Sequence, residues 1–320
     1  MIRGHDRAVS QFADAWATRR LHHAWLLAGP KGVGKASFAA AAARRVLAEA
    51  AGPTFDLPDI DSPPDHPMVK LIDAGSHPDM RWLERLPREK GEGLARDITV
   101  DQVRGLGDFM GMSAAMSGWR VAVIDSMDEM AGPGANALLK MLEEPPANTL
   151  FFLVSHAPGR LLPTIRSRCR RLDFKALGDD AMASILADQS SALDAAKRSR
   201  IIAMAFGSAG RALALAELDL AKIEEQAVAI LRQGDSTNKR RSDLAQELSK
   251  KNSGDRYAAF LDLTPSLIAR EARRLDGAPR ERALDAYGRA RELAAIAPRL
   301  SLDPAATVFQ LGGILASVPD

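Results

Sequence analysis

A glycine-rich segment at residues 29–36 has the spacing of a phosphate-binding loop. Glycines allow the backbone N–H groups to turn toward an anion, and a helix that begins at the loop adds its positive dipole end. Three glycines and a lysine occupy the positions that wrap a phosphate: Gly29, Gly32, Gly34 and Lys35. The last position normally carries the Ser or Thr hydroxyl that holds Mg²⁺, and here it is Ala36. The residues therefore predict a phosphate cradle without its magnesium ligand.

A second nucleotide motif is an apolar strand that ends in an acid. Residues 121–124 are Val-Ala-Val-Ile, and Asp125 follows at the position that could orient a magnesium-bound water. Alone, Asp125 would be an ordinary strand-end acid, but the upstream loop favours the motif. A hydrolytic site usually places Glu next to polarise the attacking water, and this chain has Ser126. Asp128 and Glu129 would substitute only after a local shift, so the two losses together predict a site that does not hydrolyse ATP.

Arginines gather just after the last predicted strand. Four lie within six residues: Arg166, Arg168, Arg170 and Arg171. A local basic patch and a solvated face would both give this pattern, and the same holds for residues 239–241. Cys169 is the only cysteine, which excludes an internal disulfide and a cysteine-rich zinc site.

Composition restricts the class of protein. The 320 residues are 46% hydrophobic and 26% charged, which suits a soluble globular protein of two or three domains. The net charge of +2 gives no global field that would attract nucleic acid. No apolar run approaches the roughly 20 residues of a membrane span, and the charged N-terminus lacks a signal-peptide core. We therefore expect a cytoplasmic protein without a membrane partner.

Alternating apolar and helical patterns predict an α/β domain with a parallel sheet over residues 1–175. Strands are expected at 25–28, 80–83, 120–125 and 150–155, and helices at 38–47 and 136–144. Thr99 and Gln102 form a capping box that opens another helix. Residues 52–67 hold five prolines and four aspartates without periodicity, which predicts a loop or a partly disordered insertion.

Beyond about residue 177 only helical patterns remain. Helices are expected at 179–186, 194–205 and 210–218, followed by an all-helical segment with breaks near 234–238, 251–254 and 277–279. The predicted organisation is an α/β P-loop domain (1–175), a small helical lid (176–217) and a C-terminal helical domain (218–320).

An ordered series of motifs resembles the bacterial clamp loader subunits of the AAA+ class, and most closely the delta-prime family of DNA polymerase III. The series extends over roughly residues 4–175 and continues through 207–213. Its members are residues 4–5, 21–24, 75–79 (GSHPD), 136–146 (NALLKMLEEPP), 151–155 (FFLVS) and 161–169 (LLPTIRSRC). The order of the motifs, rather than any single one, carries the resemblance.

The resemblance implies a role for Arg168. The family's Ser-Arg-Cys motif falls on Ser167, Arg168 and Cys169, and its arginine reaches across a subunit boundary to the γ-phosphate of a neighbour's ATP. A guanidinium suits this task because it donates to two phosphoryl oxygens in a planar fork. The alternative is that Arg168 pairs with a carboxylate of its own domain. Cys169 is expected to be a small packed residue rather than a nucleophile.

The chain also departs from the family. Many delta-prime relatives bind zinc through four cysteines that are missing here, and His66 and His77 are too few to replace them, so we expect no zinc. The lid arginine that reads phosphates in hydrolysing relatives falls on Gly210, and Arg211 is turned from that position by about 100°. Ser155 and His156 lie where the family places a polar sensor, and their role is left open.

Taken together, the resemblance implies a non-catalytic subunit of a pentameric clamp loader that helps to place a sliding clamp on primed DNA. Gamma/tau-type subunits would supply the ATPase sites, a delta subunit would open the clamp, and residues 218–320 would form an oligomerising collar. No cofactor is required, and ATP binding at the degenerate loop stays open. Two alternatives remain: an active AAA+ motor subunit or branch-migration helicase that uses Ser37, and an adaptor that binds ATP without hydrolysing it.

Overall fold

The computed structural model describes residues 2–88, 94–190, 193–217, 220–250 and 253–319. The chain divides into two compact units, Met1–Ala181 and Met182–Asp320. The first unit contains the predicted α/β domain. The second contains the predicted C-terminal helical domain and most of the predicted lid.

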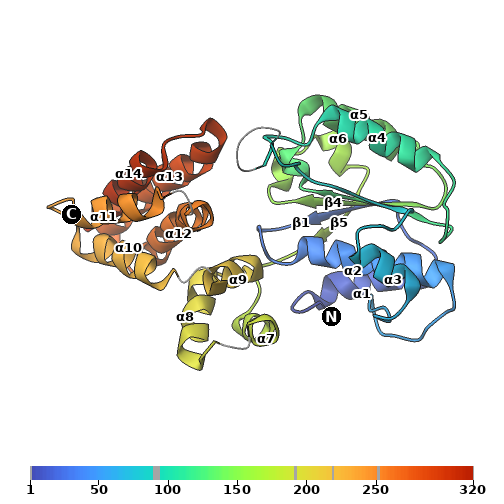
Figure 1. Ribbon diagram of the computed structural model, residues 1–320, viewed down its shortest axis with the longest axis horizontal. Coiled ribbons are helices and arrows are strands. Elements are labelled where there is room, and N and C mark those ends of the chain that lie inside the picture. The colour runs from blue at the N-terminus through green and yellow to red at the C-terminus, as the bar shows by residue number, and fades with distance from the viewer. Residues whose placement is uncertain (1, 89–93, 191–192, 218–219, 251–252, 320) are drawn as a thin grey trace. The chain divides into compact units, whose positions relative to one another are not determined.

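A parallel five-stranded sheet forms the centre of the first unit (Figure 1). Its strand order is β2-β3-β4-β1-β5. Its strands are β1 (Ala24–Ala28), β2 (Met80–Leu83), β3 (Arg120–Asp125), β4 (Thr149–Ser155) and β5 (Arg170–Asp173). The inner strands β1 and β4 are buried throughout, which explains their continuous apolar runs. The four predicted strands are confirmed to within one residue. The edge strand β5 was not predicted, because Arg170 and Arg171 break its apolar pattern.

The register of the sheet brings three chain segments to one edge. Ala28 of β1 pairs with Ser155 of β4, and Asp125 of β3 pairs with Val154 of β4. All three strands end there, and parallel α/β sheets bind ligands beyond the carboxyl ends of their strands. The glycine-rich loop, the acidic segment and the polar residues after β4 are therefore neighbours.

Helices cover both faces of the sheet (Figure 1). One side carries α1 (Asp6–Ala17), α2 (Lys35–Ala51) and α3 (Pro67–Asp73), and the other carries α4 (Val100–Gly111), α5 (Gly132–Glu143) and α6 (Pro163–Arg166). Phe12 and Phe38 pack on the first face against Phe152, while Leu138 packs on the second against Phe151. Short 3₁₀ turns follow β3 (η1, Met127–Glu129) and β4 (η2, Pro158–Arg160).

The predicted helix boundaries hold with small shifts. The capping box at α4 is confirmed, with the Gln102 amide donating to Thr99 Oγ1 at 3.3 Å and the Thr99 amide donating to Gln102 Oε1 at 2.9 Å. Helix α5 begins at Gly132, four residues before the predicted start at 136, because Pro133 suits a first helical turn. Helices α1 and α3 were not predicted.

Residues 52–66 form an irregular loop that is tied to α2. Arg45 Nη1 donates to the carbonyl oxygens of Leu57 at 2.8 Å and Asp61 at 3.0 Å. The same guanidinium lies 4.8 Å from the centre of the Phe55 ring and 2.7 Å from Glu49. The predicted loop is thus present, and a single arginine holds both its backbone and its aromatic side chain.

Within the described residues of the second unit, the regular secondary structure is entirely helical. Its helices are α7 (Asp179–Gln189), which begins before the unit boundary, α8 (Ala195–Ala205), α9 (Ala209–Glu217), α10 (Ala221–Gln233), α11 (Lys239–Leu248), α12 (Gly254–Ala272), α13 (Gly277–Leu300) and α14 (Pro304–Ala316). The break predicted at 277–279 lies a few residues earlier, because α12 ends at Ala272 and α13 begins at Gly277. Residues 218, 251 and 252 of the predicted boundaries lie outside the described residues.

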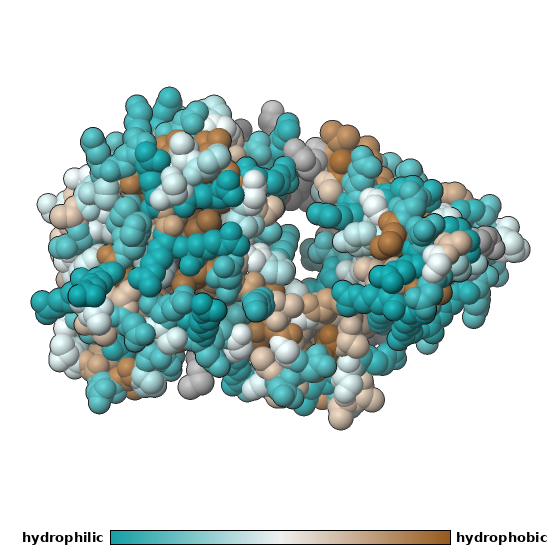
Figure 2. Space-filling view, turned by 180° about the vertical axis from the view of Figure 1, so that it is seen from behind, coloured by the Kyte–Doolittle hydropathy of each residue, from teal (hydrophilic) through white to brown (hydrophobic). Residues whose placement is uncertain are grey.

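Within the described residues, no helix is both long and apolar enough to cross a bilayer. The visible face in Figure 2 is mainly hydrophilic, with hydrophobic residues interspersed.

Candidate functional site

The glycine-rich loop connects β1 to α2 and is shaped by close backbone approaches. A Cβ atom at Gly29 would lie 2.1 Å from the carbonyl oxygen of Phe174, so only glycine fits there. Gly34 has φ of 105°, in the left-handed region that favours glycine. The N-terminal segment also supports the loop, because His5 Nε2 donates to the carbonyl oxygen of Val33 at 2.7 Å. The loop is therefore held in shape from two sides.

Lys35 begins α2 and is only 3% exposed. Its Nζ donates to the carbonyl oxygens of Gly29 at 2.6 Å and Pro30 at 2.5 Å. Burial lowers the pKa of Lys35 to about 8, against the opposing attraction of Asp125 and Asp128. An ammonium has three N–H donors, so one remains for a phosphate.

Asp125 ends β3 and is half-buried at this edge of the sheet. Its pKa is raised by burial first and then by the negative charges of Glu84 and Glu129, while Lys35 lowers it. The next residue, Ser126, donates from its hydroxyl to Asp128 Oδ2 at 3.2 Å. Position 126, where a hydrolytic site needs a general base, thus holds a serine hydroxyl that already donates a hydrogen bond to Asp128.

Asp128 is the best-connected carboxylate of the site. Oδ1 accepts from Ser155 Oγ at 2.8 Å and from the Ala157 amide at 3.2 Å, and Oδ2 accepts from the His156 amide. Ser155 and His156, whose role the sequence left open, therefore hold the 3₁₀ turn after β3 against the end of β4. Burial, reinforced by Lys35, lowers the pKa of His156 to about 4, so its ring is neutral near pH 7.

Glu129 is engaged in a different direction. Its Oε2 lies 2.8 Å from Arg85 Nε in an ion pair with both side chains about a quarter to a third exposed. Both carboxylates that follow Asp125 therefore have partners. Neither is placed to activate a water without breaking its contacts.

Arg168 lies in the short connection between α6 and β5. Its Nη2 lies 2.8 Å from Glu143 Oε1, and its Nη1 donates to the Thr164 carbonyl oxygen at 2.9 Å. The isolated chain thus has the pairing within the domain that the sequence offered as the alternative. The side chain is still 35% exposed, so part of the guanidinium faces solvent.

The other members of the arginine cluster differ in their surroundings. Arg170 stacks 4.9 Å from the centre of a Trp25 ring, and Arg171 pairs with Asp173 at 2.6 Å, so both stabilise the edge strand. Arg166 is exposed. Burial raises the pKa of the Cys169 thiol to about 12, which fits a packed residue and not a nucleophile.

Arg211, in the second unit, joins two helices. Its Nη1 donates to Ser266 Oγ at 2.7 Å, and its Nη2 donates to the carbonyl oxygen of Asp262, both on α12. The Arg211 guanidinium therefore connects α9 to α12 within the second unit.

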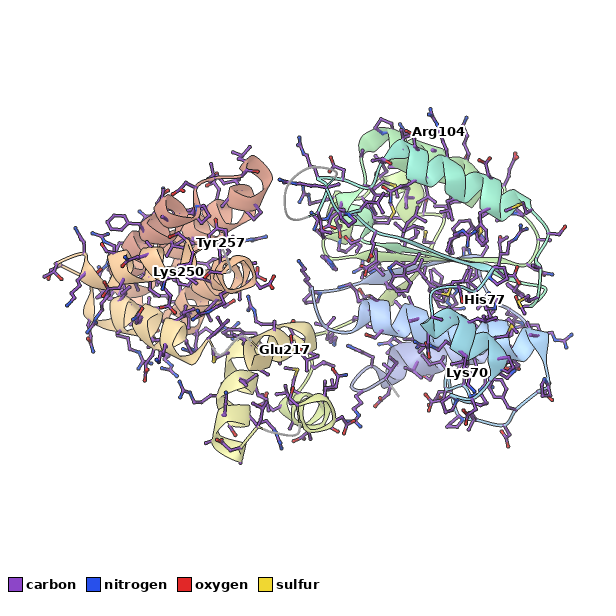
Figure 3. The ribbon with its side chains drawn as sticks, viewed as in Figure 1. Lys70, His77, Arg104, Glu217, Lys250 and Tyr257 are labelled. Carbon is purple, nitrogen blue, oxygen red and sulfur yellow. The ribbon has the colours of Figure 1, made fainter. Side chains whose placement is uncertain are left out.

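His66 and His77 both lie around Met68. His66 Nδ1 accepts from the Met68 amide at 3.3 Å, and His77 Nε2 lies 3.2 Å from Met68 Sδ. Figure 3 labels His77 in the turn after α3, together with Lys70 on that helix. In the part of the chain that the structure describes, no group of three or more His, Cys, Asp or Glu residues is placed to hold a metal ion.

Comparison with known proteins identifies relatives. Residues 4–178 match the protein family described as "DNA polymerase III, delta subunit". DNA polymerase III subunit delta' of Pseudomonas aeruginosa is 41% identical over 150 residues, covering 46% of this chain and 41% of the relative. Subunit delta' of Escherichia coli is 36% identical (47% and 43% covered), and subunit tau of Bacillus subtilis is 30% identical (56% and 29% covered). Each match spans less than half of the relative's own length.

Proposed function

The chain belongs to the family of DNA polymerase III delta subunits, and we propose that it acts as a non-catalytic delta-prime subunit of a sliding-clamp loader. Its relatives include delta' and tau subunits of DNA polymerase III. In the proposed assembly, gamma/tau-type subunits bind and hydrolyse ATP, and a delta subunit opens the clamp. This chain supports the ring and supplies Arg168 to the ATP of one neighbour while the clamp is placed on primed DNA.

One observation carries the non-catalytic assignment: each candidate for activating water is already engaged. Asp128 accepts four hydrogen bonds, from Ser126, Ser155 and the amides of residues 156 and 157, and Glu129 pairs with Arg85. Ala36 offers no hydroxyl to a magnesium ion. The glycines and Lys35 fit a phosphate group, but the surrounding residues do not fit a hydrolysing magnesium–nucleotide complex. We accordingly propose that no cofactor and no zinc are needed.

The chemistry of phosphoryl transfer supports a trans-acting role for Arg168. Arg168 keeps part of its guanidinium in solvent, yet this chain lacks the residues to use it on a nucleotide of its own. Phosphoryl transfer is accelerated by fixed positive charge on the phosphate oxygens, and a neighbouring subunit's ATP is a natural target.

The test is the Arg168→Ala variant, reconstituted with wild-type motor and delta subunits, sliding clamp and primed DNA. We expect normal assembly and a DNA-stimulated ATPase rate reduced by roughly two- to tenfold, less than the 10³-fold or more of single-site enzymes because one of several ATP sites is affected. Arg168→Lys should rescue poorly, since an ammonium cannot form the forked contact. The exposed neighbour Arg166→Ala is the matched control.

An Arg168→Ala complex that assembles normally and hydrolyses ATP at the wild-type rate would make Arg168 a structural residue. The adaptor alternative would then gain support, because the phosphate cradle around Lys35 is intact. A titration of the isolated chain with ATP, with and without Mg²⁺, would decide whether that cradle is used.

A further inference from the structure

The guanidinium of Arg168 is held at two points that come from different helices. Glu143, the last residue of α5, lies 2.8 Å from Nη2, and the carbonyl oxygen of Thr164 in α6 accepts from Nη1 at 2.9 Å. The side chains of Arg168 and Glu143 are 35% and 47% exposed. The pair therefore lies at the surface, where a second molecule can approach it.

Two anchors orient the guanidinium without exhausting it. Arginine carries five N–H donors in a rigid plane, so three remain after the contacts to Glu143 and Thr164. A free arginine side chain would sample many rotamers and would lose that freedom on contact with a phosphate. Fixing the plane in advance reduces this loss, which is the general advantage of preorganisation in electrostatic catalysis.

The position of Glu143 adds to the effect. It ends α5, and the C-terminal end of a helix carries partial negative charge that favours a nearby cation. Its carboxylate and the end of the helix both draw the arginine to this site. The contact to Thr164 then sets the direction of the guanidinium plane.

We propose that Glu143 is a positioning residue that holds Arg168 oriented for the phosphate of a neighbouring subunit's nucleotide. The inference rests on the proposed function of Arg168 in trans. Glu143 itself does not touch the nucleotide: a carboxylate would repel the phosphate. Its effect passes entirely through the arginine.

The chain offers a matched control beside the proposed residue. Glu144 follows directly, is exposed and makes no ion pair with the residues that the structure describes. Glu143→Ala removes the anchor, whereas Glu143→Gln keeps an acceptor oxygen and removes only the charge. The corresponding changes at Glu144 alter the surface charge equally and leave Arg168 anchored.

The experiment uses the complete loader, reconstituted with each variant, and measures ATPase rate against ATP concentration in the presence of clamp and primed DNA. We expect Glu143→Ala to lower kcat by roughly two- to fivefold, with Glu143→Gln between it and wild type, and an unchanged KM for ATP. The Glu144 variants should match wild type. The double variant Glu143→Ala with Arg168→Ala should be no slower than Arg168→Ala alone, because Glu143 acts through Arg168.

The outcomes separate this proposal from the one on which it rests. If Arg168→Ala slows the loader and Glu143→Ala does not, positioning by Glu143 is wrong and the role of Arg168 stands. A faster Glu143→Ala loader would show that the ion pair restrains Arg168, which also overturns the proposal. Additive effects in the double variant would mean that Glu143 acts by another route. If Arg168→Ala itself changes nothing, the trans-acting role fails first.

Discussion

The carboxylate of Asp128 accepts hydrogen bonds from three consecutive residues at the end of β4, Ser155, His156 and Ala157. Asp128 lies three residues after Asp125, in the segment where a hydrolytic enzyme has its acidic residues. The hydroxyl of Ser126 supplies a fourth donor. With its lone pairs used in this way, Asp128 links β3 to β4 and is not free to accept a proton from water.

Replacing Asp128 should therefore affect stability. Asp128→Asn presents an NH₂ group to donors that need an acceptor, and leaving buried donors unpaired costs about 1–3 kcal/mol. We expect the free energy of unfolding of the first unit to fall by about 2 kcal/mol, measured by urea denaturation. Asp108→Asn, at an exposed position on α4, should change it by less than about 0.5 kcal/mol. Equal effects of the two variants would contradict the structural role.

Site residues that follow a fixed local spacing could be predicted, and those that depend on sheet register could not. Gly29, Gly34 and Lys35 belong to one contiguous motif, so the sequence alone places them together. The contact between Asp128 and Ser155 joins residues 27 positions apart and requires β3 and β4 to be paired as they are. The ion pair between Glu143 and Arg168 likewise depends on where α5 ends.

At the scale of elements, prediction succeeded where apolar periodicity or capping chemistry was strong. The buried strands β3 and β4 are continuous apolar runs, and the capping box marked α4. Prediction failed for β5, whose first two residues are exposed arginines, and for α3, a seven-residue helix that follows a proline-rich loop. Such elements are stabilised by tertiary contacts more than by their own propensities.

The loop at residues 52–66 illustrates a tertiary contact of this kind. Arg45 of α2 binds the backbone at Leu57 and Asp61 and stacks on Phe55. Glu49, which also accepts from Trp16 Nε1 at 3.0 Å, holds the guanidinium in place. One partly buried arginine thus fastens this loop to α2.

Arg45→Ala should release this loop. The change removes two hydrogen bonds that the charged guanidinium donates to backbone carbonyl oxygens, and it removes a cation–π contact. We therefore expect the free energy of unfolding to fall by about 2 kcal/mol and amide hydrogen exchange to become faster across residues 53–61. The neighbouring Arg44 pairs with Asp73 at the surface, so Arg44→Ala should have little effect. Unchanged exchange in the Arg45→Ala loop would show that other contacts hold it.

At the scale of the whole chain, polar side chains join the helices of the second unit. Glu224 of α10 lies 3.9 Å from both Arg200 of α8 and Arg270 of α12. Arg211 connects α9 to α12 in the same unit. One ion pair, between Arg200 and Glu224, and the hydrogen bonds of Arg211 therefore join helices of the predicted lid to helices of the predicted collar.

The two units should respond differently to acid. All six histidines lie in the first unit, and burial lowers the pKa values of His5, His23 and His77 below 6.5 and that of His156 to about 4. The unfolded chain then binds protons at a higher pH than the folded unit does, so stability is lost as pH falls below about 6.5. In the second unit, burial raises the pKa of Glu224. The folded unit therefore binds a proton at this residue more readily than the unfolded chain does, and protonation of Glu224 at lower pH favours the folded state.

Intrinsic fluorescence can test this prediction on the intact protein, because all four tryptophans lie in the first unit and both tyrosines in the second. Urea unfolding followed by tryptophan emission should show a stability loss between pH 7.5 and pH 5.5, to which His156 alone contributes about 1.4 kcal/mol. Burial raises the pKa of Asp125, so protonation of this carboxylate at lower pH acts in the opposite direction. His156→Gln should reduce the loss while keeping the amide contact to Asp128. A tryptophan transition that does not move between these pH values would mean that the buried histidines are protonated as easily in the folded unit as in the unfolded chain.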